Sequence, residues 1–420
     1  MGLHRGAALL VALVLCAGCT SATMPGPSET TAPQSSSAST AVGRPSGAPT
    51  ATSLSMPGDS AGLDDAPPVI PDTALDGSVP AKPGRDYTIV KVVGPPAQGG
   101  LIRGALAFGP QGDVLTYDGV MPTDERLRPE TMKLLRRTGE VTALSRAVPH
   151  RQSTNGDLVG NTAVWWSTSS TNLFVADWQI WASRHGQKGR LLADSTKVTP
   201  GRTPPPPSYT PLTTDGTTVY WEAPRYVADR AVADLMAARA DGSGKPRVLA
   251  KGAKLPQPTR RGLFYVRSND VSPDVTMVGG EIRLRDRNGR DEVVVSVPLT
   301  KGNRISDMCA SEGRLAWAVD NGDRSELYVR DELGHSERRV LNNDSGGISL
   351  ACGDHFVAWG GGSGSGDMTQ YVWAGPGKPI LRLDNSPGMA WVEASGDLFG
   401  WSHHTDEDSR TSALTIARLR

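Results

Sequence analysis

A phrase that recurs seven times between Tyr117 and Trp401 constrains this fold more than any other feature. Each copy is a glycine, a short apolar run and an aromatic residue that ends a strand, and the clearest copies are GRLAW, GDHFVAW and GDLFGW. These aromatic anchors are Tyr117, Trp165, Trp221, Tyr265, Trp317, Trp359 and Trp401. Neighbouring anchors are separated by 42 to 56 residues, which is the length of a four-stranded propeller blade. The repeats predict an all-β chain that forms a single β-propeller of seven four-stranded blades.

The last repeat lacks a fourth strand. GMAWVEA, LFGWSH and ALTIARLR supply three strands, and the sequence then ends at Arg420. The segment TIVKVV, within Tyr87 to Val93, is a strand with no repeat of its own. We expect this N-terminal strand to complete the last blade, because pairing would remove an exposed sheet edge. Six blades with an accessory strand pair is the alternative.

Two segments carry a resemblance to a known family. FGPQGDVLTYDG (Phe108 to Gly119) and ELYVRDELG (Glu326 to Gly334) resemble the strand-turn-strand signature of TolB-like propellers, which are related to the WD-repeat class. The resemblance covers about Tyr87 to Arg420 and implies the propeller architecture. It implies no single function, because such propellers serve as scaffolds, as peptidase-associated domains and as sugar lyases.

The N-terminal region is typical of an exported, tethered protein. Residues 1–19 combine a basic start, an apolar run and a small-residue site that resembles a bacterial lipobox ending at Cys19. We expect a lipid on Cys19 and anchoring to the outer face of the cytoplasmic membrane, with ordinary secretion as the alternative. Residues 20–85 are rich in Ser, Thr, Pro, Ala and Gly and predict a disordered tether. Residues 86–420 would then form the propeller.

The charge balance excludes a global electrostatic attraction to nucleic acid. The chain has 44 basic and 44 acidic residues, so its formal net charge is zero. It contains no Walker loop, no dinucleotide fingerprint and no paired Cys-x-x-Cys motif. We therefore expect no cofactor and no nucleic acid partner, and we expect a monomer.

Acidic residues and histidines gather where the second and third strands of the repeats are joined. Asp118 and Asp320 are examples, and the densest group is HHTDED, which contains His403, His404 and Asp406. Such groups bind hard cations or Zn²⁺, so these three residues are candidate metal ligands. The alternative is that Asp and Gly are ordinary turn formers. Adjacent histidines in a strand point to opposite faces, which disfavours a shared ion.

Basic and aromatic residues gather in the third repeat and form a candidate binding patch. Arg225, Tyr226 and Arg230 lie close together in the sequence, after the proline-rich insertion from Pro200 to Pro211. Guanidinium and aromatic groups suit a glycan, a carboxylate or a peptide. The competing interpretation is that the aromatic residues of this region belong to the core.

Cys309 and Cys352 occupy the same position in ISDMC and ISLAC, which are the predicted inner strands of consecutive blades. An oxidising compartment would favour a disulfide between them, and two buried free thiols are the alternative.

Two classes of function fit these observations. The first is an envelope-anchored binding or scaffold module for a protein partner or a cell-wall polymer. The second is an exported carbohydrate-active enzyme, a lyase or hydrolase, with its site at the channel mouth. The sequence has no local catalytic motif, which favours binding, and it names no catalytic residue.

Overall fold

The computed structural model describes seventeen stretches of the chain, all within one compact unit, residues 61–420. They are residues 69–70, 78–94, 101–120, 130–146, 151–169, 177–198, 212–227, 230–267, 280–297, 304–320, 325–331, 336–341, 348–362, 368–375, 377–383, 392–404 and 412–420. The predicted signal sequence with Cys19 and most of the predicted tether lie outside them.

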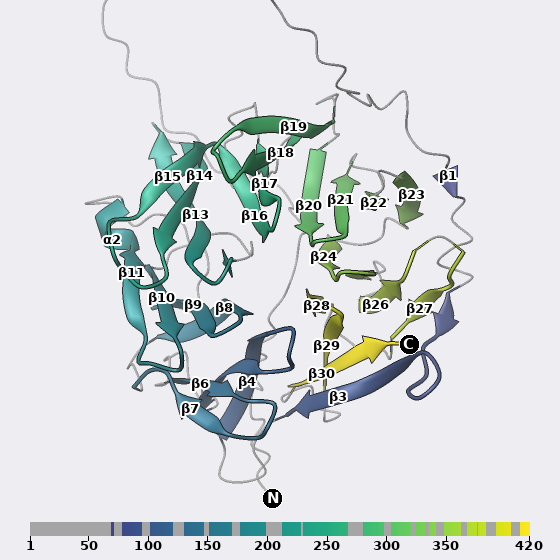
Figure 1. Ribbon diagram of the computed structural model, residues 1–420, viewed down its shortest axis with the longest axis horizontal. Coiled ribbons are helices and arrows are strands. Elements are labelled where there is room, and N and C mark those ends of the chain that lie inside the picture. The colour runs from purple at the N-terminus through teal and green to yellow at the C-terminus, as the bar shows by residue number, and fades with distance from the viewer. Residues whose placement is uncertain are drawn as a thin grey trace, which may run out of the picture. The chain divides into compact units, whose positions relative to one another are not determined.

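Seven antiparallel sheets form a ring, as the repeats predict, and each sheet is one blade (Figure 1). Within blades 1 to 6, the four strands follow one another in sequence from the axis outward. The seven innermost strands contact each other in turn, from β4 through β8, β12, β16, β20 and β24 to β28 and back to β4. The chain is therefore a seven-bladed β-propeller, and the six-bladed alternative is wrong.

The first four blades come from residues 101–296. Blade 1 consists of β4 (Leu101–Phe108), β5 (Val114–Val120), β6 (Thr131–Leu135) and β7 (Val141–Ala143). Blade 2 consists of β8 (Gln152–Val159), β9 (Thr162–Thr168), β10 (Trp178–Arg184) and β11 (Arg190–Asp194), followed by the short helix α2 (Ser195–Val198). Blade 3 consists of β12 (Thr213–Thr214), β13 (Thr218–Val227), β14 (Arg230–Arg239) and β15 (Arg247–Lys251). Blade 4 consists of β16 (Ala253–Thr259), β17 (Gly262–Arg267), β18 (Glu281–Asp286) and β19 (Asp291–Ser296).

The remaining blades use both ends of the propeller sequence. Blade 5 consists of β20 (Arg304–Ala310), β21 (Arg314–Asp320), β22 (Ser325–Asp331) and β23 (Ser336–Leu341). Blade 6 consists of β24 (Ile348–Cys352), β25 (Val357–Gly362), β26 (Met368–Trp373) and β27 (Ile380–Arg382). Blade 7 consists of β28 (Val392–Ser395), β29 (Leu398–His404), β30 (Ser412–Leu419) and the N-terminal strand β3 (Tyr87–Val93).

Blade 7 confirms the predicted closure. β3 pairs antiparallel with β30, with Tyr87 opposite Leu419 and Val93 opposite Leu414. Figure 1 shows the purple β3 beside the yellow β30, so the two ends of the propeller sequence share one sheet. Tyr87 and Val93 are buried, and this burial gives the joint an apolar core.

The aromatic anchors all lie on second strands and explain why the phrase repeats. Seven clusters of buried apolar side chains each join two neighbouring blades. Trp317, for example, belongs to the cluster between blades 4 and 5, and Trp359 to the cluster between blades 5 and 6. In several copies, the glycine of the phrase adopts a backbone conformation that other residues rarely adopt: Gly160, Gly216 and Gly396 have φ angles of 59°, 90° and 62°. Each repeat thus encodes one turn and one interface between blades.

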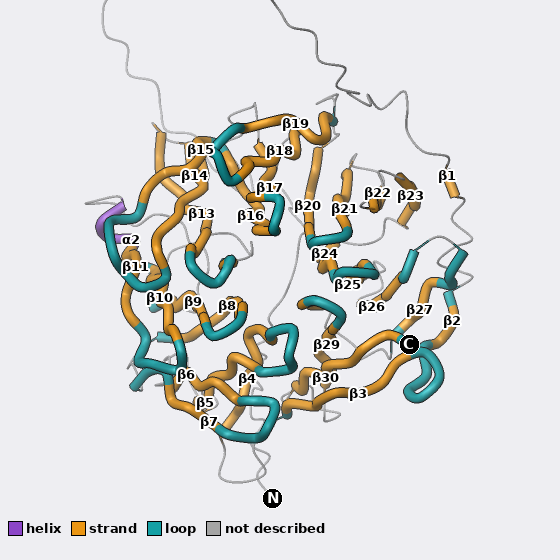
Figure 2. The backbone as a smooth tube through the Cα atoms, in the orientation of Figure 1, coloured by secondary structure: helices purple, strands orange, loops and turns teal. Residues whose placement is uncertain are grey.

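Two short strands lie inside the segment that we predicted to be tether, so ordered structure begins before residue 86. β1 (Val69–Ile70) pairs parallel with β23, the outer strand of blade 5. β2 (Val79–Pro80) pairs parallel with β27, the outer strand of blade 6. Figure 2 shows β1 and β2 outside these blades. Each strand is only two residues long, so neither produces the alternating pattern from which a strand is predicted.

Candidate binding site at the loop face

The propeller has two different ends, which we call the loop face and the turn face. The loop face carries the connections between second and third strands and between successive blades. Most of these connections lie outside the described residues, and Gly252, between β15 and β16, is an exception. The turn face carries the short turns after first and third strands. Binding residues gather on connecting segments more often than on the strands that they join, which favours the loop face as the position of a site.

The inner strands become polar toward the loop face. The residue that follows each aromatic anchor on the second strand pairs with a residue on the inner strand, and we call such a pair a rung. The described pairing includes this rung in five blades. Its inner-strand residue is polar in all five: Arg103, Asn155, Lys254, Asp307 and Ser349. We call these five residues the polar rung. On the anchor's own rung the partners are Gly or apolar, as with Gly156, Met308 and Leu350. The inner strands therefore carry polar residues near the loop face.

In blade 1, the polar-rung residue Arg103 belongs to a compact ion cluster. Asp118 accepts hydrogen bonds from Arg103 Nε at 2.8 Å and from Lys133 Nζ at 2.5 Å. The Arg103 guanidinium holds the pKa of Asp118 below its usual value. In blade 5, Arg304 Nη2 lies 3.2 Å from Asp320 Oδ2. These two acids, which the sequence offered as cation ligands, therefore already have cationic partners.

Four carboxylates link one blade to the inner strand of the next. Glu130 accepts the backbone N–H of Ser153 at 2.6 Å, and Asp157 accepts that of Thr214 at 2.8 Å. Glu222 accepts the N–H of Leu255 at 2.9 Å, and Asp307 accepts that of Leu350 at 2.8 Å. We call these four residues the cross-blade acids. Asp157 and Asp307 use their second oxygen on the N–H of the following residue.

Burial is the main cause of the raised pKa values of three cross-blade acids. It raises the pKa of Glu130 to about 7, that of Asp157 to about 6 and that of Asp307 to about 7, and nearby Glu222 adds to the rise at Asp307. A pKa near 7 suits a general acid. In Asp157 and Asp307, however, both oxygens already accept backbone hydrogen bonds. These two residues therefore hold blades together and are poorly placed to transfer a proton to a substrate.

The backbone next to this region is strained at one position. Leu255 has a φ of 54°, in the left-handed region that residues with a Cβ rarely adopt. It lies at a bulge in β16 between the pairs of Lys254 and Gln257, and its N–H is the donor to Glu222. Glu222 and Lys254 are both buried. Strained residues beside buried charges gather at functional sites more often than elsewhere.

The candidate binding patch lies on the longest hairpin among the described residues. β13 and β14 have ten residues each, whereas β21 and β22 of blade 5 have seven. The pairing places Arg225 opposite Val232 and Val227 opposite Arg230. Residues 225 and 230 therefore share one face of the hairpin, and Tyr226 occupies the other. The structure brings the two arginine positions together near the loop face and separates the tyrosine from them.

The candidate metal ligands that the structure describes do not lie in one cluster. His403 and His404 are consecutive in β29 and pair with Ala413 and Ser412, so they occupy opposite faces. Asp406 lies outside the described residues. Among those that are described, no group of three or more His, Cys, Asp or Glu residues is arranged to hold a metal ion.

The two inner-strand cysteines meet between blades 5 and 6. Cys309 and Cys352 form a disulfide, with their Cα atoms 5.4 Å apart. Asp307, two residues before Cys309, crosses the same interface through its bond to Leu350. The disulfide and the carboxylate therefore act on the same pair of inner strands.

Comparisons with known proteins add likenesses of fold. No family model matches the chain, and no curated protein matches it. It is similar to the β-propeller domain of the trilobed protease from Pyrococcus furiosus, at 10% identity and a TM-score of 0.43, covering 72% of this chain and 91% of that one. It is also similar to an acylaminoacyl peptidase from Pyrococcus horikoshii, at 8% identity and a TM-score of 0.48, covering 76% of this chain and 52% of that one. The chain thus spans about half the length of that peptidase.

Proposed function

We propose that this protein is a binding or scaffold module of the cell envelope that holds a protein partner or a cell-wall polymer at its loop face. The observation that carries the proposal is the long β13–β14 hairpin, which extends beyond the usual blade length and bears Arg225, Tyr226 and Arg230. The polar rung supports it, because it places polar residues on the inner strands at the same end of the ring.

A carbohydrate-active enzyme is the competing proposal. The observation that favours it is the near-neutral pKa of Glu130, about 7. Its carboxylate is engaged by Ser153 of the next blade, which is the role shared by the other cross-blade acids. The hydrogen bond to Ser153 thus explains the position of Glu130 without catalysis. The binding proposal also accounts for the long β13–β14 hairpin.

The anchoring part of the proposal rests on the sequence around Cys19. Among the described residues, no helix is long and apolar enough to cross a membrane. A lipid on Cys19 would attach the protein to the outer face of the cytoplasmic membrane. We expect Cys19→Ala to release the processed protein into the soluble fraction, and membrane retention equal to wild type by a variant whose precursor is still processed would contradict lipidation.

The binding proposal is tested by replacing Arg225, Tyr226 and Arg230 together with Ala. Recovery of partner from envelope extracts, and co-sedimentation with isolated cell-wall polymer, should both be measured. We expect binding to be lost with an unchanged melting temperature, because positions near the end of a hairpin usually tolerate substitution.

The matched control replaces three residues of a turn at the opposite end: Arg287, Asn288 and Arg290, between β18 and β19. This variant should bind as wild type does. Undiminished binding by the hairpin variant, or equal loss in both variants, would contradict the site.

A further inference from the structure

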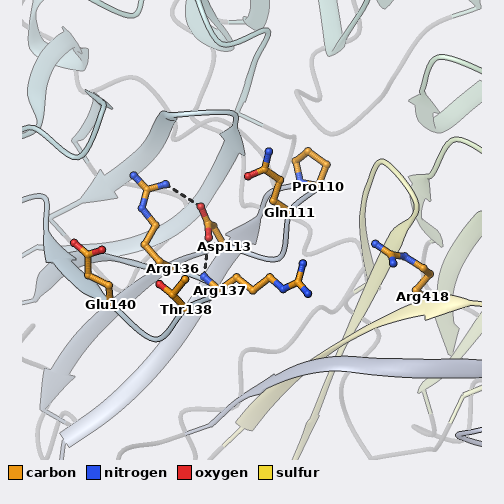
Figure 3. A pocket seen from close by; sticks show the side chains of 8 residues that line it. All are labelled: Pro110, Gln111, Asp113, Arg136, Arg137, Thr138, Glu140 and Arg418. Carbon is orange, nitrogen blue, oxygen red and sulfur yellow. Dashed lines mark hydrogen bonds and ion pairs between the residues drawn. The ribbon is translucent and has the colours of Figure 1, made fainter.

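A second polar site lies on the turn face, where blade 7 meets blade 1. An open hollow of about 570 Å³ is lined there by the turn after β4, the turn after β6 and the end of β30. Its side chains include Gln111, Asp113, Arg136, Arg137 and Arg418 (Figure 3). The hollow therefore lies at the seam where the N-terminal strand closes the ring.

Two of the three arginines that line the hollow have carboxylate partners. Arg136 Nη1 lies 2.8 Å from Asp113 Oδ2, and Asp113 Oδ1 accepts the N–H of Arg137 at 2.7 Å. Arg418 Nε lies 2.7 Å from Asp397 Oδ2, and its Nη2 lies 3.4 Å from Asp397 Oδ1. The carboxylates of Asp113 and Asp397 thus fix the positions of these arginines and balance their charges.

Arg137 is different. Its side chain is exposed, and no acceptor among the described residues contacts its guanidinium. Figure 3 shows it extending across the hollow toward Arg418, with Glu140 on the far side of Arg136. Lys91 adds a further cation to the seam, since its Nζ donates to the carbonyl oxygen of Arg136 at 2.8 Å. The seam therefore has four cations, Lys91, Arg136, Arg137 and Arg418, against the three carboxylates of Asp113, Glu140 and Asp397, and of its three guanidinium groups that of Arg137 is left without a carboxylate among the described residues.

We propose that the hollow binds a phosphate group between the guanidinium groups of Arg137 and Arg418. Guanidinium donors match the spacing of phosphate oxygens and form charge-assisted hydrogen bonds with them. Arg418 already directs Nε and Nη2 at Asp397, which leaves Nη1 for the ligand. The Gln111 amide, on the rim, supplies a neutral donor. This site is independent of the proposed loop-face function and lies at the opposite end of the ring.

The chain contains a matched position for testing this proposal. In blade 4, the turn after β18 repeats the hydrogen bonds of the turn after β6: Gly289 N–H donates to Asp286, as Gly139 N–H donates to Arg136. Arg287 therefore stands where Arg137 stands, and it is equally exposed, but it does not line the hollow. Arg287→Gln removes the same charge from the same type of turn.

The experiment titrates inorganic phosphate into the purified protein at constant ionic strength and follows binding by calorimetry. We expect saturable binding of one phosphate per chain. Arg137→Gln and Arg418→Gln should each weaken it by about ten-fold, the effect of losing one charge-assisted contact. Arg287→Gln should leave it unchanged, and all variants should fold, as judged by circular dichroism.

Dimethyl phosphate, titrated in the same way, distinguishes the sources of the group. Binding equal to that of inorganic phosphate would uphold the site and indicate a phosphodiester, whereas binding of inorganic phosphate alone would uphold it and indicate a free phosphate or a monoester. Absence of saturable binding, full binding by Arg137→Gln, or equal weakening by Arg287→Gln would overturn the proposal.

Discussion

Single carboxylates connect the blades of this propeller. Each cross-blade acid accepts a backbone N–H from the next inner strand, which is an edge strand and pairs within its own blade on one side only. These acids could not be predicted from sequence, because an Asp within ISDMC looks like an ordinary polar position in a strand. Third-strand arginines act similarly at the outer side, as Arg285 donates to the carbonyl oxygen of Leu249 in the preceding blade at 2.7 Å.

The raised pKa values of the cross-blade acids predict a pH dependence of stability. Glu130, Asp157 and Asp307 have folded pKa values of about 6 to 7, above the value of about 4 expected for an unfolded carboxyl group. Between these values the folded state binds more protons than the unfolded state, so the free energy of unfolding falls as pH rises from about 4 to about 7.

Asp307→Asn isolates one of these contributions. The urea midpoint of the wild type should be lower at pH 8 than at pH 5.5, and this difference should shrink in Asp307→Asn because one titrating group is gone. Asp157→Asn serves as a second variant. Differences identical to those of the wild type in both variants would contradict the assignment.

The disulfide between Cys309 and Cys352 is a second connection between blades that is made by single residues. Its partners are 43 residues apart, so chain-entropy arithmetic gives a stabilisation of about 4 kcal/mol for the closed loop. We expect the double variant Cys309→Ser and Cys352→Ser to lower the free energy of unfolding by up to about this amount. Thiol labelling of the denatured, unreduced protein should find neither cysteine reactive, and labelling of both would reject the bond.

At the scale of the element, strand positions were largely predictable. The second and third strands of blade 5, β21 and β22, coincide with apolar runs in the sequence, because most of their residues are buried on both faces of the sheet. β3 was predictable for a different reason: the last repeat has three strands, and a three-stranded blade would leave an edge without a partner. β1 and β2 were missed, because two residues carry no periodicity.

Deletion of the closing strand tests the role of β3. Removing Asp86 to Gly94 should lower the free energy of unfolding by at least about 3 kcal/mol, since Tyr87 and Val93 are both buried. Deleting Ser35 to Thr50 from the predicted tether is the control and should leave the melting temperature unchanged. Equal melting temperatures for the two deletions would show that the ring closes without β3.

At the scale of the whole molecule, the sequence predicted the architecture better than the site. The ring follows from repeated anchors, each of which records a local contact between two blades. A binding surface is assembled from several blades, and the polar rung became visible only when the strand register was known. The sequence grouped Arg225, Tyr226 and Arg230, and the division of these positions between two faces of the hairpin depends on that register.

The central claim is that the loop face is the binding surface, and site-specific photo-crosslinking in intact cells tests it most directly. A benzophenone side chain would be placed at position 226 on the loop-face hairpin and, in a separate strain, at position 287 on the turn face. We predict that position 226 forms a covalent adduct with a partner or a cell-wall polymer and that position 287 does not. Adducts from position 287 together with none from position 226 would contradict the claim.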